Sequence, residues 1–233
     1  MNIAVTGLNA TDNPGPGVPV IRSLRAAAEV SGRIIGLSYD SLDPGIYMEN
    51  IADKSYLIPY PSSGLEPLFE RIAYIHSREK LDVIIPTLDS ELYGFIKLSE
   101  RLRSLGIHTF LPTFDQLNLR AKDKLFDFCT MHNVKVPKNT LVSSLQDLHN
   151  IPNQFNYPVV VKGIFYDAYI AHNFNDVHAA FDKLRLKWGL PIIIQEHVTG
   201  DEFNVVALGD GSGASIGAVP MRQPQLSGDF ARL

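Results

Sequence analysis

Tyr157-Pro-Val-Val-Val-Lys-Gly163 is the stretch on which the fold of this chain depends. A continuous run of β-branched residues is typical of a strand that is buried on both faces. The run ends in a lysine, and a cation at the end of a buried strand requires an anion to balance it. Lys162 is therefore the first candidate for a binding residue.

A second apolar strand, Pro191-Ile-Ile-Ile-Gln-Glu196, follows further along the chain and also ends in polar groups. The two strands together predict a cleft whose walls carry these polar ends. What the cleft holds decides the function.

The composition is that of an ordinary globular protein. The chain has 233 residues, of which 45% are hydrophobic and 20% charged, and its net charge is -4. This length is sufficient for one large domain or two small ones. The charge gives no sign of nucleic-acid binding, and no apolar run is long enough for a bilayer. One cysteine and the absence of a secretion signal predict a cytoplasmic protein.

The first half alternates strand-like and helix-like segments, which is typical of an α/β domain with a mainly parallel sheet. This order predicts a Rossmann-like layout with ligand loops at strand ends. A proline and a helix-capping pattern at 112–115 predict the boundary between domains 1–114 and 115–233. Strands are expected at 2–6, 33–38, 82–85 and 107–111, and helices at 18–28, 66–76 and 88–105.

The second half is predicted to be of α+β type. An Asn or Asp is expected to cap the helix that ends at Trp188, and a turn at Gly209–Gly213 is expected to close a hairpin. Helices are expected at 118–132, 145–150 and 175–188, and strands at 136–141, 157–162, 169–171, 191–196, 201–208 and 214–220.

In this order the second half resembles the nucleotide-binding part of the ATP-grasp superfamily, and it is most similar to the branch of the carbamoyl-phosphate synthase large subunit and biotin carboxylase. The resemblance covers roughly 115–220. It implies a Rossmann-like (pre-ATP-grasp) domain, 1–114, followed by an incomplete ATP-grasp domain, 115–233, with the N-terminal lobe and the start of the C-terminal lobe. The motifs are Ala-Lys-Asp-Lys124-Leu-Phe-Asp-Phe, Val-Lys-Val-Pro137, the strand to Lys162, and Gln195-Glu196-His-Val-Thr-Gly200-Asp-Glu202.

The resemblance implies two basic residues at the phosphates of ATP. Lys124 and Lys162 resemble the pair that flanks the nucleotide, and ATP needs cations along its phosphates. The alternative for Lys124 is surface pairing with Asp123 or Asp127 on a charged helical face. The alternative for Lys162 is an ordinary solvated lysine at the end of a strand.

The resemblance also implies residues for adenine and ribose. Gln195 to Val198 resembles the hinge between lobes, where Glu196 would accept a hydrogen bond from the adenine amino group and the backbone near Val198 would read the ring edge. Glu202 resembles the carboxylate that binds the ribose hydroxyls. The alternative is that both acids are exposed side chains near a glycine turn.

Two departures from the family pattern concern catalysis. Lys162 is followed by Gly163-Ile-Phe-Tyr-Asp-Ala-Tyr169, where the family has a glycine-rich loop that closes over the phosphates. The sequence also ends at Leu233, before the Glu-x-Asn pair that binds magnesium in the family. No catalytic residue and no metal ligand is therefore assigned, and a C-terminally truncated enzyme is expected.

The implied function is ATP binding in an ATP-dependent carboxylate-amine ligase that acts through an acyl-phosphate, with magnesium as the expected cofactor. The alternatives are a non-catalytic nucleotide-binding or regulatory module, and one half of a two-chain ligase. The expected partners are ATP, an unidentified carboxylate or amine, and either a second chain with the missing lobe or another copy of this chain.

Four further patterns were weighed. The loop Gly7–Gly17 lacks the third glycine of a dinucleotide fingerprint, which leaves an NAD-linked oxidoreductase as a weak third hypothesis. Asp89 and Glu91 follow a buried strand and could either orient a substrate amine or cap a helix, and capping is favoured. Gly213-Ala-Ser215-Ile-Gly217 has the letters of a nucleophile elbow but reads as a strand, and the seven histidines form no zinc-binding pattern.

Overall fold

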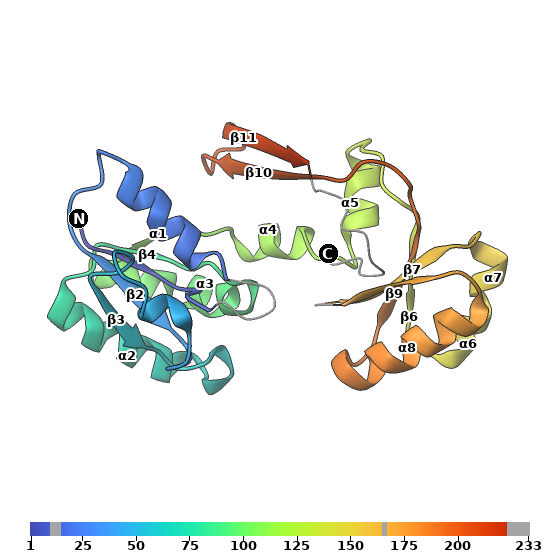
Figure 1. The fold of residues 1–233 in the computed structure, drawn as a ribbon, viewed down its shortest axis with the longest axis horizontal. Helices are drawn as coiled ribbons and strands as arrows, with labels where there is room; N and C mark the ends of the chain where they lie inside the picture. Colours follow the sequence, from blue (N-terminus) through green and yellow to red (C-terminus); the bar gives the residue numbers. More distant parts are fainter. Residues whose placement is uncertain (10–14, 165–166, 223–233) are drawn as a thin grey trace. The chain divides into compact units, whose positions relative to one another are not determined.

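The computed structural model describes residues 1–9, 15–164 and 167–222. The chain forms two compact units, Met1–Phe114 and Asp115–Leu233, which are coloured blue to green and green to red in Figure 1. Parts of the first loop, of the connection after Lys162 and of the C-terminal segment lie outside the described residues. The first unit is α/β and the second is α+β, so the predicted fold class is confirmed.

The first unit contains a five-stranded parallel sheet with the strand order β3-β2-β1-β4-β5. Ile3 in β1 lies opposite Ile34 on one side and Val83 on the other. The strand order reverses between β1 and β4, as in a Rossmann-like sheet. The strands are β1 (Ile3–Val5), β2 (Ile34–Ser38), β3 (Lys54–Leu57), β4 (Val83–Ile85) and β5 (His108–Thr109).

The edge strand β3 was missed by the sequence analysis. Lys54 and Leu57 at its ends are exposed, and the two residues between them are only partly buried. A strand without a buried face lacks the apolar alternation that predicts a strand.

Helices cover both faces of this sheet. One face packs on α2 (Leu65–Glu79) and α3 (Asp89–Ser104), which bury side chains such as Ile72 and Phe95. The other face packs on α1 (Gly17–Ala26), which buries Ile21. Two 3-10 helices, η1 (Pro44–Ile46) and η2 (Pro61–Ser63), complete the connections.

The second unit contains a four-stranded antiparallel sheet with the order β6-β9-β7-β8. The strands are β6 (Asn139–Val142), β7 (Val159–Gly163), β8 (Ala168–Ala171) and β9 (Ile192–Glu196). The two apolar strands of the sequence analysis, β7 and β9, pair directly, with Val161 opposite Ile194. The two strands are therefore neighbours in one sheet, and the cleft between their polar ends stays a prediction.

One face of the second sheet is covered by α6 (Leu145–His149), α7 (Ile151–Gln154) and α8 (Phe174–Trp188). The predicted cap of α8 is confirmed, because the side chain of Asn173 accepts a hydrogen bond from the backbone N–H of Asp176 at 3.0 Å. The buried cluster between helices and sheet consists of Val142, Leu148, Ile151, Phe155, Val159, Val161, Ala171, Val177, Ala180, Phe181, Leu184, Ile192 and Ile194.

The predicted helix 118–132 is wrong in its extent. The structure has two helices here, α4 (Phe114–Leu119) and α5 (Leu125–Met131). Between them the backbone N–H of Lys124 bonds to the carbonyl of Ala121 at 2.9 Å, which closes a turn in place of a helical turn. Lys124 thereby becomes the N-cap residue of α5.

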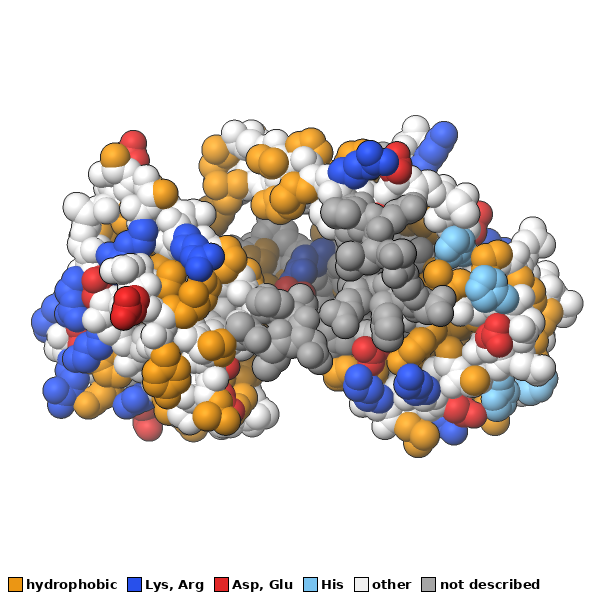
Figure 2. Space-filling model, viewed as in Figure 1, with side chains coloured by type: hydrophobic (Ala, Val, Ile, Leu, Met, Phe, Trp, Pro, Cys, Tyr) orange, Lys and Arg blue, Asp and Glu red, His pale blue; other side chains and the backbone are white. Residues whose placement is uncertain are grey.

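The remaining element is the hairpin of β10 (Phe203–Gly209) and β11 (Ser215–Arg222). Val206 lies opposite Val219, and every residue of both strands is exposed. Figure 2 shows the apolar side chains that gather on this hairpin. Ser215 lies within β11, so the nucleophile-elbow pattern is a strand. None of the helices in the described ranges has the length and apolar character needed to cross a membrane.

Candidate functional site

The face of the second sheet opposite α6, α7 and α8 carries Lys162 and Gln195. Lys162 pairs with Ile193, and Gln195 pairs with Val160. Paired residues in adjacent strands share a face, and alternate residues along a strand point to opposite faces. Since the flanking residues of β7 and β9 point into the helix-covered cluster, these four lie on the other face. Val160 and Ile193 are only 8% and 2% exposed, so this face is covered beside the lysine, and the side chains that line it there are apolar.

Lys162 is a cation in an unfavourable environment. Burial lowers the pKa of Lys162, and the positive charge of Lys122 lowers it further, while the carboxylate of Glu202 raises it. Within the described ranges, the Lys162 ammonium has neither a hydrogen bond nor an ion pair at contact distance. A partly buried ammonium without such a contact is a favourable place for an anion.

The charges beside Lys162 come from parts of the chain that are distant in sequence. Glu202 lies in the loop before β10, and Lys122 lies in the turn between α4 and α5. The structure thus brings Lys162 and Glu202, two of the predicted residues, into electrostatic range. Sequence reasoning missed Lys122, because the assumed continuous helix concealed the turn that carries it.

Lys124, the predicted second phosphate residue, occupies the N-cap position of α5 without a side-chain capping bond. No charge interaction between it and Lys162 is found in the described part of the chain. Lys122 occurs in the same Ala-Lys-Asp-Lys motif, so the signal was present in the sequence. Single substitutions of Lys122 and Lys124 can distinguish their roles, because of these two lysines Lys122 is the one that lowers the pKa of Lys162.

Glu196 pairs with Val159, so it lies on the face of the sheet opposite Lys162. Its Oε2 accepts the backbone N–H of Lys138 at 3.1 Å, and its own backbone N–H donates to the Lys138 carbonyl at 2.8 Å. The side chain therefore supports the pairing of β9 with the start of β6. Val198 follows β9 and is 64% exposed.

A buried acid lies at the carboxyl ends of the strands in the first unit, the edge at which sheets of this kind bind ligands. Glu91 is 1% exposed, and its Oε1 accepts the backbone N–H groups of Thr87 at 2.6 Å and Leu88 at 2.8 Å. The hydroxyls of Thr6 and Tyr39 also donate to this carboxylate. Glu91 thus caps α3, as favoured from the sequence.

The glycines of the loop after β1 are explained by close backbone packing. A Cβ atom on Gly17 would lie 1.9 Å from the carbonyl oxygen of Thr6. Gly7 has a φ of +71°, which side-chain-bearing residues rarely adopt, and a Cβ there would lie 2.1 Å from the hydroxyl of Thr87. These contacts account for the glycines without a dinucleotide.

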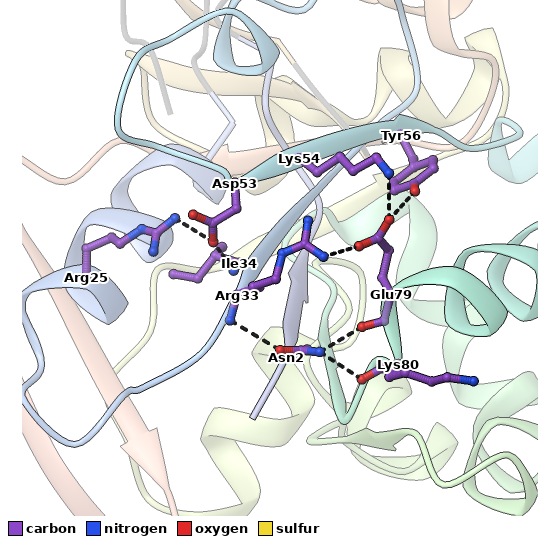
Figure 3. Close-up of polar contacts among 9 residues, drawn as sticks. All are labelled: Asn2, Arg25, Arg33, Ile34, Asp53, Lys54, Tyr56, Glu79 and Lys80. Carbon is purple, nitrogen blue, oxygen red and sulfur yellow. Dashed lines mark hydrogen bonds and ion pairs between the residues drawn. The ribbon is translucent and has the colours of Figure 1, made fainter.

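A further charged cluster lies at the opposite, amino-terminal ends of the strands in the first unit (Figure 3). The carboxylate of Glu79, at the end of α2, accepts hydrogen bonds from Arg33 at 2.5 Å, from Lys54 at 2.8 Å and from the hydroxyl of Tyr56. Bonds from Lys54, Tyr56 and Arg33 lower the pKa of Glu79 to about 2. All of these partners belong to the sheet and its helix, so we assign this cluster to stability.

No group of three or more His, Cys, Asp or Glu side chains that could hold a metal ion is found in residues 1–9, 15–164 and 167–222. The described residues that suit an anionic nucleotide are Lys162 and Lys122 for phosphate, Gln195 for a hydrogen bond on the same sheet face, and Glu202 for a hydroxyl. These side chains offer positive charge and hydrogen-bonding groups rather than a set of metal ligands.

No protein-family model and no curated protein sequence matches the chain. Solved structures do match. An L-amino acid ligase from Bacillus licheniformis is 17% identical with a TM-score of 0.72, and the match covers 99% of this chain and 52% of the ligase. An ADP complex of N5-carboxyaminoimidazole ribonucleotide synthetase is 15% identical with a TM-score of 0.66, and the match covers 97% of this chain and 55% of the synthetase.

The third structure is the biotin carboxylase domain dimer of 2-oxoglutarate carboxylase from Hydrogenobacter thermophilus, in complex with MgADP, ADP and bicarbonate. It is 15% identical with a TM-score of 0.59, and the match covers 87% of this chain and 45% of that domain. This chain therefore spans about half the length of the structures it matches.

These three proteins are ATP-grasp enzymes, and the chain has the fold of one part of such an enzyme. The resemblance inferred from the sequence motifs is thus confirmed at the level of the fold.

Proposed function

We propose that this chain binds ATP beside Lys162, on the face of the second sheet opposite α6, α7 and α8, as the nucleotide-binding part of an ATP-dependent ligase. The observation that carries the proposal is Lys162, a partly buried cation beside the apolar residues Val160 and Ile193. Its charge is opposed by Lys122 and compensated only in part by Glu202. An ATP phosphate would supply the missing negative charge. In this proposal the units Met1–Phe114 and Asp115–Leu233 correspond to the pre-ATP-grasp and ATP-grasp domains.

The remaining site residues receive roles by their positions. Gln195 lies on the same face as Lys162 and would contact the nucleotide directly. Glu196 would accept a hydrogen bond from the adenine amino group with lone pairs that Lys138 does not use, and the backbone near Val198 would read the edge of the ring. Glu202 would bind the ribose hydroxyls. Lys124 is proposed as a second phosphate contact, for which Lys122 is the competing candidate.

The reaction proposed is of the carboxylate-amine ligase kind, in which ATP phosphorylates a carboxylate and a nucleophile then displaces phosphate from the acyl-phosphate. The lysines would hold the phosphates and neutralise their charge, since positioning and electrostatic stabilisation supply most of the catalysis in phosphoryl transfer. Magnesium would supply further charge neutralisation when bound. The described residues do not fit a magnesium site, so we assign no step to the metal.

Calorimetric titration of the chain with ATP, with and without magnesium, tests this proposal. Lys162→Met is expected to weaken ATP binding by about tenfold or more, because a hydrogen-bonded charge pair with phosphate would be lost. Lys183→Met is the matched control: Lys183 lies on α8, where its ammonium is 4.5 Å from the centre of the Tyr169 ring. Unchanged ATP affinity in Lys162→Met would remove Lys162 from the site.

The exposed hairpin favours a second candidate, one half of a two-chain ligase. A hairpin alone is marginally stable in water, and both faces of this one are apolar. We propose that β10 and β11 are covered by polypeptide that supplies the other half of the enzyme. The chain alone is then expected to bind ATP without hydrolysing it, and measurable ATP turnover by the isolated chain would exclude this candidate. The exposed apolar residues are Phe203, Val205, Val206, Leu208, Ile216, Val219 and Met221.

A further inference from the structure

We propose that the first sheet binds an acidic polypeptide segment at its edge strand β3, to which the segment adds as a further strand. The binding surface is the edge ladder, which we define as the side chains of Lys54, Tyr56, Arg71, Tyr74 and Arg78. The inference is independent of the proposed function, because it uses none of the residues that are proposed to bind ATP.

The edge ladder alternates cations with tyrosine rings in one continuous row. The ammonium of Lys54 lies 5.2 Å from the centre of the Tyr56 ring. The guanidinium of Arg71 lies 5.9 Å from the same ring and 5.2 Å from the ring of Tyr74. Arg78 completes the row, 4.8 Å from the Tyr74 ring. Stacking on an aromatic ring orients a guanidinium and leaves the N–H groups at its edge able to bond in its plane.

Two elements supply the edge ladder, each at its own periodicity. Lys54 and Tyr56 are alternate residues of β3, so their side chains share a face of the sheet. That face is the one covered by α2, because Tyr56 packs against the cluster to which α2 contributes. Arg71, Tyr74 and Arg78 follow one another at the spacing of a helical stripe, so they lie on one side of α2.

The charges of α2 are divided between two sides of the helix. Glu66 forms an ion pair with Arg101 of α3 at 2.5 Å, and Glu70 also acts on the charge of Arg101. Arg71 and Arg78 lie on the side toward β3. In residues 1–9, 15–164 and 167–222 no carboxylate lies within ion-pair distance of either arginine. The acids of α2 therefore serve α3, and its arginines face the sheet edge uncompensated.

Glu79 is the carboxylate that contacts the edge ladder, and it is already fully engaged. Its side chain is buried, and it bonds to Lys54 at 2.8 Å and to Arg33 at 2.5 Å (Figure 3). One carboxylate thus serves two cations, and Arg71 and Arg78 receive no share of it. Exposed cation–π contacts contribute little stability, so the fold alone does not account for these two arginines. Carboxylates of a bound segment would complete the surface.

β3 offers backbone groups beside these charges. It pairs with β2 on one side, with Ser55 opposite Gly36, and none of the strands in the described ranges pairs with its other side. An open edge is a template for an added strand, whose main-chain bonds supply affinity. Arg71 donates its Nε–H to the Leu57 carbonyl at 2.7 Å, which holds this guanidinium at the end of β3. Alternate side chains of an added strand would lie on the face toward α2, where glutamates can pair with Lys54 and Arg71.

The edge ladder distinguishes this partner from two others. A second copy of the chain would place β3 against β3 and bring like charges together, which destabilises a sheet. A nucleic acid needs aromatic faces on which its bases stack, but Tyr56 and Tyr74 each lie beside two cations already. The chain as a whole has a net charge of -4, which opposes a long polyanion more than a short acidic segment.

Fluorescence anisotropy of the whole chain with a labelled peptide of about ten residues, in which glutamate and threonine alternate, tests the proposal. Arg71→Gln combined with Arg78→Gln is expected to weaken binding by about tenfold or more, because charge-assisted hydrogen bonds are lost. Arg22→Gln combined with Arg103→Gln is the matched control, since both residues are exposed, on α1 and α3, and the change in net charge is equal. No binding by the parent, or equal weakening in both double variants, would overturn the proposal.

The single variant Arg78→Gln keeps the test decisive if the double variant fails to fold. Arg78 is exposed and its side chain makes the stacking contact with Tyr74, so the fold should tolerate its loss. We expect binding of the peptide to weaken by about threefold or more. An unchanged dissociation constant would remove Arg78 from the surface and overturn the edge ladder as the binding site.

Modified peptides test the mode of binding. Two versions of the peptide carry N-methyl groups on one or the other alternate set of amides, and one set must face β3. We expect one version to bind about tenfold more weakly than the parent peptide, and the unmodified peptide to protect 54–57 from hydrogen exchange. Equal binding of all three would refute strand addition.

The other two partners are outcomes of the same experiments. Single-stranded RNA of equal charge that binds as tightly as the peptide would assign the surface to nucleic acid and overturn the proposal. Sedimentation of the chain without peptide tests for a second copy. A dimer that Arg71→Gln with Arg78→Gln strengthens would assign the edge to that copy and also overturn the proposal.

Discussion

Glu79→Gln is expected to destabilise the first unit in a manner that depends on pH. Glu79 is 4% exposed, and its carboxylate accepts hydrogen bonds from Arg33, Lys54 and Tyr56. Glutamine keeps the shape of the side chain but removes the charge that two cations neutralise. The substitution therefore isolates the electrostatic part of the cluster.

The size of the effect follows from the pKa of Glu79, which falls from 4.5 to about 2. Each pKa unit corresponds to about 1.4 kcal/mol of free energy, so the upper limit is about 3 kcal/mol. The side chains of Arg33 and Lys54 are 47% and 49% exposed, and water screens their attraction. We therefore expect a loss of about 2 kcal/mol at pH 7.

The pH dependence has a definite sign. The pKa of Glu79 is lower in the folded state than in the unfolded state, so its stabilising contribution is complete above pH 4.5 and is lost as the pH falls from 4.5 to about 2. The difference in unfolding free energy between parent and variant should therefore shrink steadily over this range.

Urea unfolding at several pH values provides the measurement, and hydrogen exchange of the segments that contain β1 to β4 reports on the first unit. Trp188 lies in the second unit, so its fluorescence should show no matching change. Glu66→Gln is the control, because Glu66 pairs with Arg101 at an exposed position and should matter much less. A loss of equal size at pH 7 and pH 3 would refute this reasoning.

Three other predictions concern single side chains. Lys162→Met should leave the nucleotide-free chain as stable as the parent or more stable. Because the pKa of Lys162 is lowered in the folded state, any gain in stability should shrink as the pH rises toward 10.5. Urea titrations at pH 7 and pH 10 would test this. Gly17→Ala should cost about 2 kcal/mol or more of stability, because its Cβ would meet the Thr6 carbonyl. Gly94→Ala, in the interior of α3, should be neutral or stabilising by up to about 1 kcal/mol, because its Cβ would lie 3.7 Å from the nearest atom. Urea titration compares the two variants. Asn173→Ala should cost about 1 kcal/mol through loss of the cap of α8, as followed by Trp188 fluorescence in urea.

Much of the local structure could be predicted from sequence. The apolar run to Lys162 and the run to Glu196 are strands, and the segment to Trp188 is a helix with the expected kind of cap. These features follow from burial periodicity and from hydrogen bonds between close neighbours in the chain. A short window of sequence contains both kinds of information.

The pairing of strands was harder to predict from the sequence. The strands that end at Lys162 and Glu196 are hydrogen-bonded neighbours, although the whole of α8 separates them in the chain. β3 was missed because an edge strand with little buried surface has a weak pattern. Strand partners depend on contacts between segments that are distant in sequence, and local patterns do not specify those contacts.

By itself, the sequence determined most of the segments that form strands and helices, and it singled out Lys162 as a cation at the end of a buried strand. Only the tertiary structure decided which charges surround that cation. Lys122, which precedes Lys162 in the chain, and Glu202, which follows it, both affect its pKa. Asp167, although close in sequence, accepts a hydrogen bond from Trp188 of α8. The reason is physical: the pKa of a side chain depends on burial and on nearby charges in space, and both are products of the complete fold.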